Sequence, residues 1–425
     1  MKKYQLKSLI DVKRGASLAG EYYSNEGSLV RLTLGNFKEE GGFKFNTSKE
    51  NLYYTGPVKD EYILKKGDII TPLTEQVIGL LGATARIPES DKYVQSGDVA
   101  LIKSISDELY EGYCYYLISS DVVRKQLSAA AQQTKIRHTS PEKIKNCQVF
   151  LPDVSTQIKI SNLLDAIDKK ISLNVAINDN LSKLAKQLFE YWFVQFDFPD
   201  EFGRPYKSSG GKMVWNDILK QEVPEGWEIS DLTKKISITR GVAYSPKDEL
   251  NKPSENTVYL LKSNNIDNGA ITYDKPVILD KGKVKSEHFL TKGSVFITMS
   301  SGSKAHMGKT AIVYFDMNYV FGAFCSKISI SRECKNYLSM YFRSIYFRKY
   351  IEKITSGTNI NNISNEHLLS IKLPFPPKFL QQKFEQLIDI YFEKIALLIK
   401  EHDQLYSLRD FILPLLMNGQ ATISD

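Results

Sequence analysis

Two long segments of the chain carry apolar residues at alternating steps of four and three. The first series is Ile160, Leu164, Ile167, Ile171, Asn174, Asn178, Leu181, Ala185, Leu188 and Trp192. The second series is Phe384, Ile388, Tyr391, Ile395, Leu398, His402, Leu405, Arg409, Ile412 and Leu416. A sustained apolar repeat of 3.5 residues is the pattern of a coiled-coil seam. The sequence therefore predicts two long helices, within residues 151–198 and 374–420, that pair through these seams.

Three polar residues, Asn174, Asn178 and His402, interrupt the predicted seams near the middle of the helices. Polar residues at such positions can fix the register of a helix pair at some cost in stability. They can equally be exposed seam positions without that role, and the pattern alone does not decide. Antiparallel pairing of the two helices would relate the two halves of the chain by a pseudo-two-fold axis.

The two helical series lie 224 residues apart, and other segments recur at nearly the same distance. Arg14-Gly15 returns as Arg240-Gly241, and Gly82-Ala83-Thr84 returns as Gly308-Lys309-Thr310, both 226 residues later. Thr134-Lys135-Ile136 matches Thr358-Asn359-Ile360 at an offset of 224. Internal repeats of this kind decide the architecture of a chain. We interpret the sequence as one unit written twice.

Each copy begins with a segment, residues 1–150 and 227–373, in which short apolar runs follow Gly turns. Such runs predict strands, and helical patterns appear at 109–127 and 335–353. Residues 199–226 are rich in Pro, Gly and Ser and are expected to form a linker. The predicted fold is mixed α/β, with two such domains joined by two long antiparallel coiled-coil helices with pseudo-two-fold symmetry.

Each copy contains two polar segments that differ between the copies although the residues around them match. Base edges in DNA are read by amide, basic and hydroxyl side chains. The net charge of +7 permits binding to a polyanion. We expect DNA contacts from both pairs of segments, although duplicated surface loops can also diverge without a function. The candidates are Thr74, Glu75, Gln76, Lys135, Arg137 and His138 in the first copy, and Ser301, Ser303, Lys304, His306, Asn359, Asn361 and Asn362 in the second.

The sequence carries no motif of catalysis or of metal binding. It has no HExxH, no GxSxG, no zinc-ligand spacing and no Asn/Asp-Pro-Pro-Tyr/Phe motif of an amino-methyltransferase. Residues 302–310 resemble a phosphate-binding loop, but the glycine spacing is one residue too long and the first copy lacks the lysine. No catalytic residue, metal ligand or cofactor site is predicted in this chain. With no secretory signal, no transmembrane stretch and no CxxC pair, we expect a cytoplasmic protein.

The whole chain resembles the specificity subunits of type I restriction-modification systems. The resemblance lies in the two-copy layout with its paired helices and in several short segments. These are Lys-Lys-Gly-Asp-Ile-Ile at 65–70, Pro224-Glu225-Gly226-Trp227, Gly357-Thr358-x-Ile360-x-x-Ile363-Ser364 and Pro374-x-Pro376-Pro377-x-x-x-Gln381-Gln382. The first copy departs from the pattern in lacking the Pro-x-Gly-Trp entry and in having Gln133 where the second has Gly357.

The resemblance implies two target-recognition domains, each reading one half of a bipartite asymmetric site in double-stranded DNA. It implies that the helices set the distance between the half-sites and bind two methyltransferase (modification) subunits. S-adenosylmethionine would then bind in those partners, and ATP with Mg in the restriction/translocase subunits, so that this chain has no active site. The alternatives are the DNA-binding part of a fused type II enzyme, a stand-alone methyltransferase, whose motifs are missing, and a coiled-coil scaffold, which would not need divergent polar loops.

Overall fold

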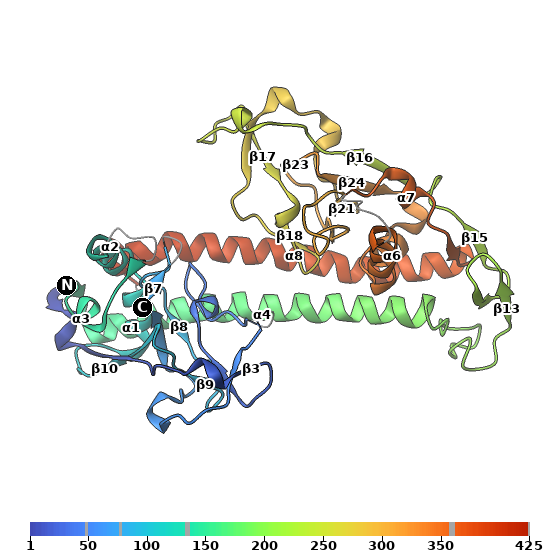
Figure 1. Ribbon diagram of the computed structural model, residues 1–425. Helices are drawn as coiled ribbons and strands as arrows, with labels where there is room; N and C mark the ends of the chain where they lie inside the picture. Colours follow the sequence, from blue (N-terminus) through green and yellow to red (C-terminus); the bar gives the residue numbers. More distant parts are fainter. Residues whose placement is uncertain (47–49, 76–78, 132–136, 357–361, 424–425) are drawn as a thin grey trace. The chain divides into compact units, whose positions relative to one another are not determined.

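The computed structural model describes residues 1–46, 50–75, 79–131, 137–356 and 362–423 (Figure 1). Its contacts divide the chain into two units. Unit 1 comprises Met1–Ser172 and Asp403–Asp425, and unit 2 comprises Leu173–His402. Each unit therefore holds one copy of the strand-rich domain, part of the long helix of that copy, and part of the long helix of the other copy. The fold is mixed α/β, as predicted.

Unit 1 is built on an antiparallel sheet of four strands. Their order is β2 (Ile10–Arg14), β10 (Val99–Ser104), β6 (Ile69–Pro72) and β8 (Ala85–Arg86). Successive side chains of a strand point to opposite faces of a sheet. Accordingly Ile69 and Ile102 are buried in one core with α1 (Glu111–Ile118) and α2 (Asp121–Ala130). Ile70 and Leu101 are buried in a second core on the other face.

Smaller elements complete unit 1. A second sheet has the order β3 (Tyr23–Ser24), β5 (Tyr53–Tyr54), β4 (Leu29–Arg31) and β9 (Tyr93–Val94), in which β4 and β9 are parallel. The pair β1 (Lys2–Gln5) and β12 (Gln148–Leu151) and the pair β7 (Thr74–Glu75) and β11 (Arg137–His138) are antiparallel. The short helix α3 (Pro141–Lys145) is capped by Ser140, whose hydroxyl accepts a hydrogen bond from the Lys143 amide.

Unit 2 repeats this topology. Its four-stranded sheet has the order β16 (Ile236–Arg240), β24 (Cys325–Ile330), β21 (Val295–Thr298) and β22 (Thr310–Ile312). The parallel pair is now β17 (Thr257–Leu261) with β23 (Tyr319–Phe321), flanked by β20 (Val277–Asp280), and the terminal pair is β15 (Glu228–Ser230) with β25 (Leu373–Phe375). The helices are α5 (Lys335–Phe342), α6 (Ile345–Ser356) and α7 (Asn365–Leu369), and β18 (Ile266–Asp267) pairs with β19 (Ala270–Ile271). The four-stranded sheets β2-β10-β6-β8 and β16-β24-β21-β22 have the same strand order in the two units, which supports the duplication.

The recurring Arg-Gly pair makes the same contacts in both units. The Arg14 Nε donates to the Gly97 carbonyl at 2.7 Å, and the Arg240 Nε donates to the Ala323 carbonyl at 3.3 Å. A Cβ on Gly15 would lie 2.2 Å from the Ser96 carbonyl oxygen, and a Cβ on Gly241 would lie 2.3 Å from the Gly322 oxygen. Glycine is needed at both positions because two backbone segments touch there.

The two long helices are α4 (Val154–Phe193) and α8 (Lys378–Met417), drawn in green and in orange-red in Figure 1. In unit 1 the beginning of α4 shares a core with the end of α8, where Ile160 and Leu164 are buried with Leu416. In unit 2 the end of α4 packs on the beginning of α8, and the Trp192 and Phe384 rings are 5.7 Å apart. The helices therefore pair antiparallel within each unit.

The side chains of the predicted seam lie toward the interior in both helices. Ile160, Leu164, Ile167, Ile171, Ile388, Ile395 and Leu398 are buried, and Leu181, Leu188, Tyr391, Leu405 and Ile412 are half-buried. Asn174 is fully buried in unit 2, and its Nδ2 donates to Glu401 Oε2 at 2.9 Å. The interpretation of Asn174 as an exposed seam position is therefore wrong.

Residues 199–226, expected to be a linker, contain an ordered hairpin of β13 (Met213–Asn216) and β14 (Gln221–Pro224). Phe196 and Phe198 precede it and pack on Trp227, each with a ring separation of 5.4 Å. Composition predicts turns in this segment, but it does not reveal that the flanking aromatic side chains are buried in the core of unit 2.

We predict that Gly15→Ala lowers the free energy of unfolding by about 1–3 kcal/mol, because the added methyl group must displace backbone atoms. Urea unfolding followed by circular dichroism measures the change. The control is Gly20→Ala in the same unit, where the nearest atom to an added Cβ is 4.0 Å away. A Gly15→Ala variant as stable as this control would contradict the account of the close contact.

Candidate nucleic-acid interface

The two polar segments of the first copy lie side by side in unit 1. Strand β7 pairs with β11, so that Thr74 is opposite His138 and Glu75 is opposite Arg137. The Thr139 amide also donates to the Leu73 carbonyl at 2.8 Å. Two segments more than 50 residues apart in sequence therefore lie next to each other.

The second copy brings its polar segments together in the same way. An antiparallel bridge joins Ser300 to Asn362, and the Ile363 amide donates to the Met299 carbonyl at 2.7 Å. Ser300 and Asn362 correspond to Thr74 and His138 at the offsets of 226 and 224. Both units thus hold two unlike polar segments side by side through the same backbone pairing, which we call the backbone frame.

Glu75 anchors the frame of unit 1. Its side chain is only 2% exposed, and its Oε2 accepts hydrogen bonds of 2.8–3.0 Å from the amides of Gly79, Leu80 and Leu81. Its Oε1 lies 2.9 Å from Arg137 Nη1, and Arg137 Nη2 also donates to Ser128 Oγ at 2.9 Å. Glu75, a candidate DNA-contact residue, therefore holds the backbone of residues 79–81 and is itself paired with Arg137, a second candidate.

The remaining candidates differ in how far they reach the surface. Thr74 is buried, whereas His138 is exposed. In unit 2, Ser303, Lys304 and Asn362 are exposed, and Ser301 and His306 are half-buried. Within this turn the Ser301 hydroxyl accepts from the Ser303 amide at 3.2 Å. Gln76, Lys135, Asn359 and Asn361 lie outside the described residues.

One arginine in each unit, Arg124 on α2 and Arg348 on α6, binds a backbone carbonyl in the corresponding segment of its unit. The sequence analysis did not predict a role for either arginine. Arg124 Nη2 donates to the Gly79 carbonyl at 3.1 Å, and Arg348 Nη1 donates to the Met307 carbonyl at 2.7 Å. Arg124-Lys125 and Arg348-Lys349 match at the offset of 224. The sequence could therefore have pointed to these arginines, because an Arg-Lys pair present at the same place in both copies indicates a common structural role.

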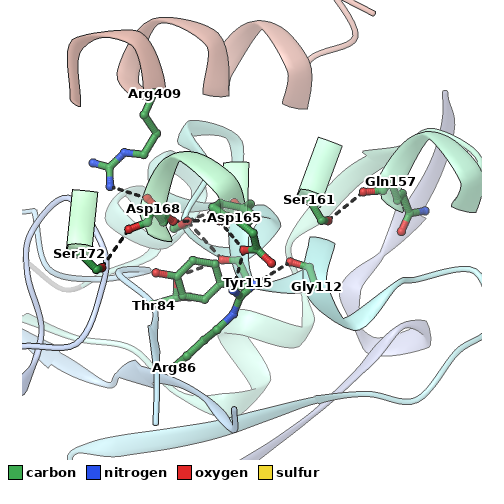
Figure 2. A network of polar contacts seen from close by, with 12 residues as sticks. Thr84, Arg86, Gly112, Tyr115, Gln157, Ser161, Asp165, Asp168, Ser172 and Arg409 are labelled. Carbon is green, nitrogen blue, oxygen red and sulfur yellow. Dashed lines mark hydrogen bonds and ion pairs between the residues drawn. The ribbon is translucent and has the colours of Figure 1, made fainter. Parts of the chain in front are cut away.

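A network of polar contacts links the first domain to both long helices within unit 1 (Figure 2). Arg86 Nη1 lies 2.6 Å from Asp165 Oδ1 on α4, and the Tyr116 hydroxyl lies 2.7 Å from Asp165 and 2.8 Å from Asp168. Arg409 on α8 reaches Asp168 at 3.3 Å. Burial raises the pKa of Tyr116, so its hydroxyl remains a hydrogen-bond donor.

In unit 2 a carboxylate of α8 accepts hydrogen bonds from the first amides of α5. Glu385 accepts from the Asn336 amide at 2.9 Å and from the Tyr337 amide at 3.1 Å. Negative charge is favourable at a helix N-terminus, but the burial of this carboxyl outweighs that effect and raises its pKa to about 7. Beside it, Lys335 Nζ lies 2.9 Å from Asp389. Partial burial acts to raise the pKa of Asp389, but hydrogen bonds from Asn336 and Lys335 outweigh this effect and lower the pKa.

The described residues contain no group of three or more His, Cys, Asp or Glu side chains placed to hold a metal ion. Among the same residues, no helix combines the length and the apolar character needed to cross a bilayer.

The sequence matches the family described as type I restriction modification DNA specificity domain over residues 1–183 and 224–406. The chain belongs to this family. Each matched stretch contains one strand-rich domain and most of the long helix that follows it. The two halves of this specificity chain are thus two copies of one family domain, in agreement with the duplication predicted from the sequence.

Curated relatives are named specificity subunits, which are the non-catalytic components of such systems. The chain is 28% identical over 212 residues to the type I restriction enzyme EcoKI specificity subunit of Escherichia coli K12, covering 47% of this chain and 44% of that protein. It is 30% identical over 172 residues to the StySPI specificity subunit of Salmonella potsdam, covering 39% and 37%. These alignments span less than half of either relative.

A crystal structure of a type I restriction-modification system S subunit from M. genitalium has the same fold. The comparison covers 100% of this chain and 96% of that chain, with a TM-score of 0.58 and 17% sequence identity. At this identity the likeness concerns the fold alone, and it supports the predicted combination of mixed α/β domains with long helices.

The raised pKa of Glu385 predicts how stability depends on pH. Because the folded state binds this proton more tightly than an unfolded chain with a pKa of 4.5, the contribution of Glu385 to the unfolding free energy falls as the pH rises from about 4.5 to about 7. Urea unfolding of the wild type and of Glu385→Gln at pH 5 and pH 8 measures it. The wild type should lose more stability than the variant between these two values.

The matched control is Glu393→Gln, an exposed glutamate on the same helix, which should keep the wild-type dependence. If Glu385→Gln also keeps that dependence, the burial of a titrating Glu385 is refuted.

Proposed function

We propose that the chain is the DNA-reading specificity subunit of a type I restriction-modification complex in the cytoplasm. It recognises a bipartite asymmetric site in double-stranded DNA, one half-site per unit. The observation that carries the proposal is the repeated backbone frame, in which β7 and β11 of unit 1 and the Ser300–Asn362 bridge of unit 2 present different polar side chains. Equal frames with unequal polar surfaces suit two readers of unlike sequences.

The chemistry of the exposed side chains suits this role. Lys304 supplies positive charge for phosphate oxygens, and Asn362, Ser303 and His138 supply donors and acceptors for base edges. Phosphate contacts give affinity that falls with salt, and base contacts give discrimination of about 1–3 kcal/mol per base pair. Two linked readers gain affinity together only when the half-sites have the right separation. The helices α4 and α8, each about 60 Å long, set that separation in our proposal.

The long helices also carry apolar side chains outside their seam. In unit 2, Leu173 and Leu184 of α4 are 53% and 48% exposed, and Ile390 and Leu397 of α8 are 63% and 64% exposed. Exposed apolar groups of this kind favour binding to another protein. We assign them to the two methyltransferase (modification) subunits, which hold S-adenosylmethionine. Restriction/translocase subunits, which hold ATP and Mg, join through the complex, and the chain thereby directs adenine methylation or ATP-dependent cleavage.

Mapping of N6-methyladenine across the genome tests the proposed function. Deletion of this gene should abolish methylation at one bipartite motif, and co-expression of the chain with its modification subunit in a methylation-free host should restore it. A co-expressed, soluble complex that methylates no bipartite motif would refute the proposal. The chain without the modification subunit is the control and should methylate nothing.

Single substitutions test whether the two units read independently. Asn362→Ala, at a position assigned to base contacts, should weaken binding through the half-site read by unit 2 by about 1–3 kcal/mol. His138→Ala should affect only the other half-site. Binding of the complex to duplexes mutated in one half-site or the other measures this. Lys183→Ala, an exposed lysine on α4, is the control and should leave both half-sites unchanged.

A further inference from the structure

The ion pair between the long helices in unit 1 has no polar counterpart in unit 2. Asp168 of α4 lies 3.3 Å from Arg409 of α8, whose side chain is only 9% exposed. At the offset of 224, Asp168 corresponds to Phe392 of α8 and Arg409 corresponds to Ala185 of α4. Phe392 and Ala185 line one small cavity of about 40 Å³ in unit 2. The same place in the helix pair is therefore charged in one unit and apolar in the other.

A second polar pair has the same property. The buried Asn174 of α4 donates to Glu401 of α8 at 2.9 Å within unit 2. The corresponding positions hold Leu398 for Asn174 and Ile177 for Glu401. By contrast, most other seam positions are apolar in both helices and do not distinguish α4 from α8.

The antiparallel arrangement fixes what each side chain would meet if two like helices paired instead. In a pair of two α4 helices, Asp168 would face Ala185, and Asn174 would face Ile177. In a pair of two α8 helices, Arg409 would face Phe392, and Glu401 would face Leu398. Each polar group would then lose its partner on the opposite helix and face a hydrocarbon side chain, and such a loss is unfavourable for a buried or half-buried group. Asp168 would keep the hydrogen bond from Tyr116, and Arg409 would keep the ion pair with Asp410.

We infer that Asp168–Arg409 and Asn174–Glu401 act as a pairing code that selects a helix of the other copy as the partner and rejects a like helix. The apolar seam drives the association of the helices, and the two polar pairs determine which helices associate. As a result, every helix pair carries one domain of the first copy and one domain of the second copy. This inference rests on the helix contacts and does not depend on the proposed function.

Single substitutions in the full-length chain reproduce the rejected contacts. Arg409→Ala leaves Asp168 facing alanine, as in a pair of α4 helices, and Asp168→Phe leaves phenylalanine facing Arg409, as in a pair of α8 helices. The double variant Asp168→Phe with Arg409→Ala recreates the apolar contact of unit 2. Each single variant should raise the equilibrium constant of unfolding at least tenfold, and the double variant should return to within about threefold of the wild type.

Urea unfolding of the four proteins measures this cycle, and Glu401→Ile, Asn174→Leu and their double variant form a second cycle with the same expected pattern. If a phenylalanine or alanine variant fails to fold, Asp168→Asn and Arg409→Gln form a milder cycle. The control cycle uses Lys186→Ala and Glu190→Ala, an exposed lysine and a half-buried glutamate 3.8 Å apart within α4, whose effects should add. Additive effects at Asp168 and Arg409 and at Asn174 and Glu401 would overturn the pairing code.

Discussion

Neither half of the sequence supplies a complete core for its own domain. In unit 1, Leu416 and Met417 from the second copy are buried together with Ile160 and Leu164 of the first. In unit 2, Trp192 and Phe193 from the first copy are buried together with Phe384 and Ile388 of the second. Because burial of apolar side chains provides most of the stability of such cores, each domain depends on the antiparallel pairing of α4 and α8.

The polar contacts between domain and helix have diverged where the apolar contacts have not. In unit 1, Arg86 and Tyr116 bind the carboxylates of α4, whereas in unit 2 Glu385 of α8 accepts hydrogen bonds from the start of α5. Gln157 and Gln381 are a pair that kept its role, since each donates to the carbonyl of the proline before its helix at 3.0 Å. The duplication therefore retained the position of each helix on its domain while the side chains that secure it changed.

Local periodicity predicted the long helices and the duplication because both repeat along the sequence. It could not predict that β7 pairs with β11, since contacts between distant segments leave no periodic signal. Because this pairing is not visible in the sequence, Glu75 was predicted to contact DNA. In the structure its oxygens bind Arg137 and three backbone amides. Arg124 and Arg348 were missed although they match between the copies. The buried aromatic residues beside the hairpin of β13 and β14 were hidden by a composition typical of a linker.

The frame that holds the candidate DNA-contact residues depends mostly on backbone groups. The bonds from Thr139 to Leu73 and from Ile363 to Met299 join main-chain atoms, and Arg124 and Arg348 bind carbonyl oxygens of the loops. Exposed side chains such as His138, Lys304 and Asn362 take no part in these bonds. Substitution at the exposed positions therefore changes the surface that a unit presents without removing a bond of the frame. A duplicated domain with this construction can acquire two different specificities while both copies keep one fold.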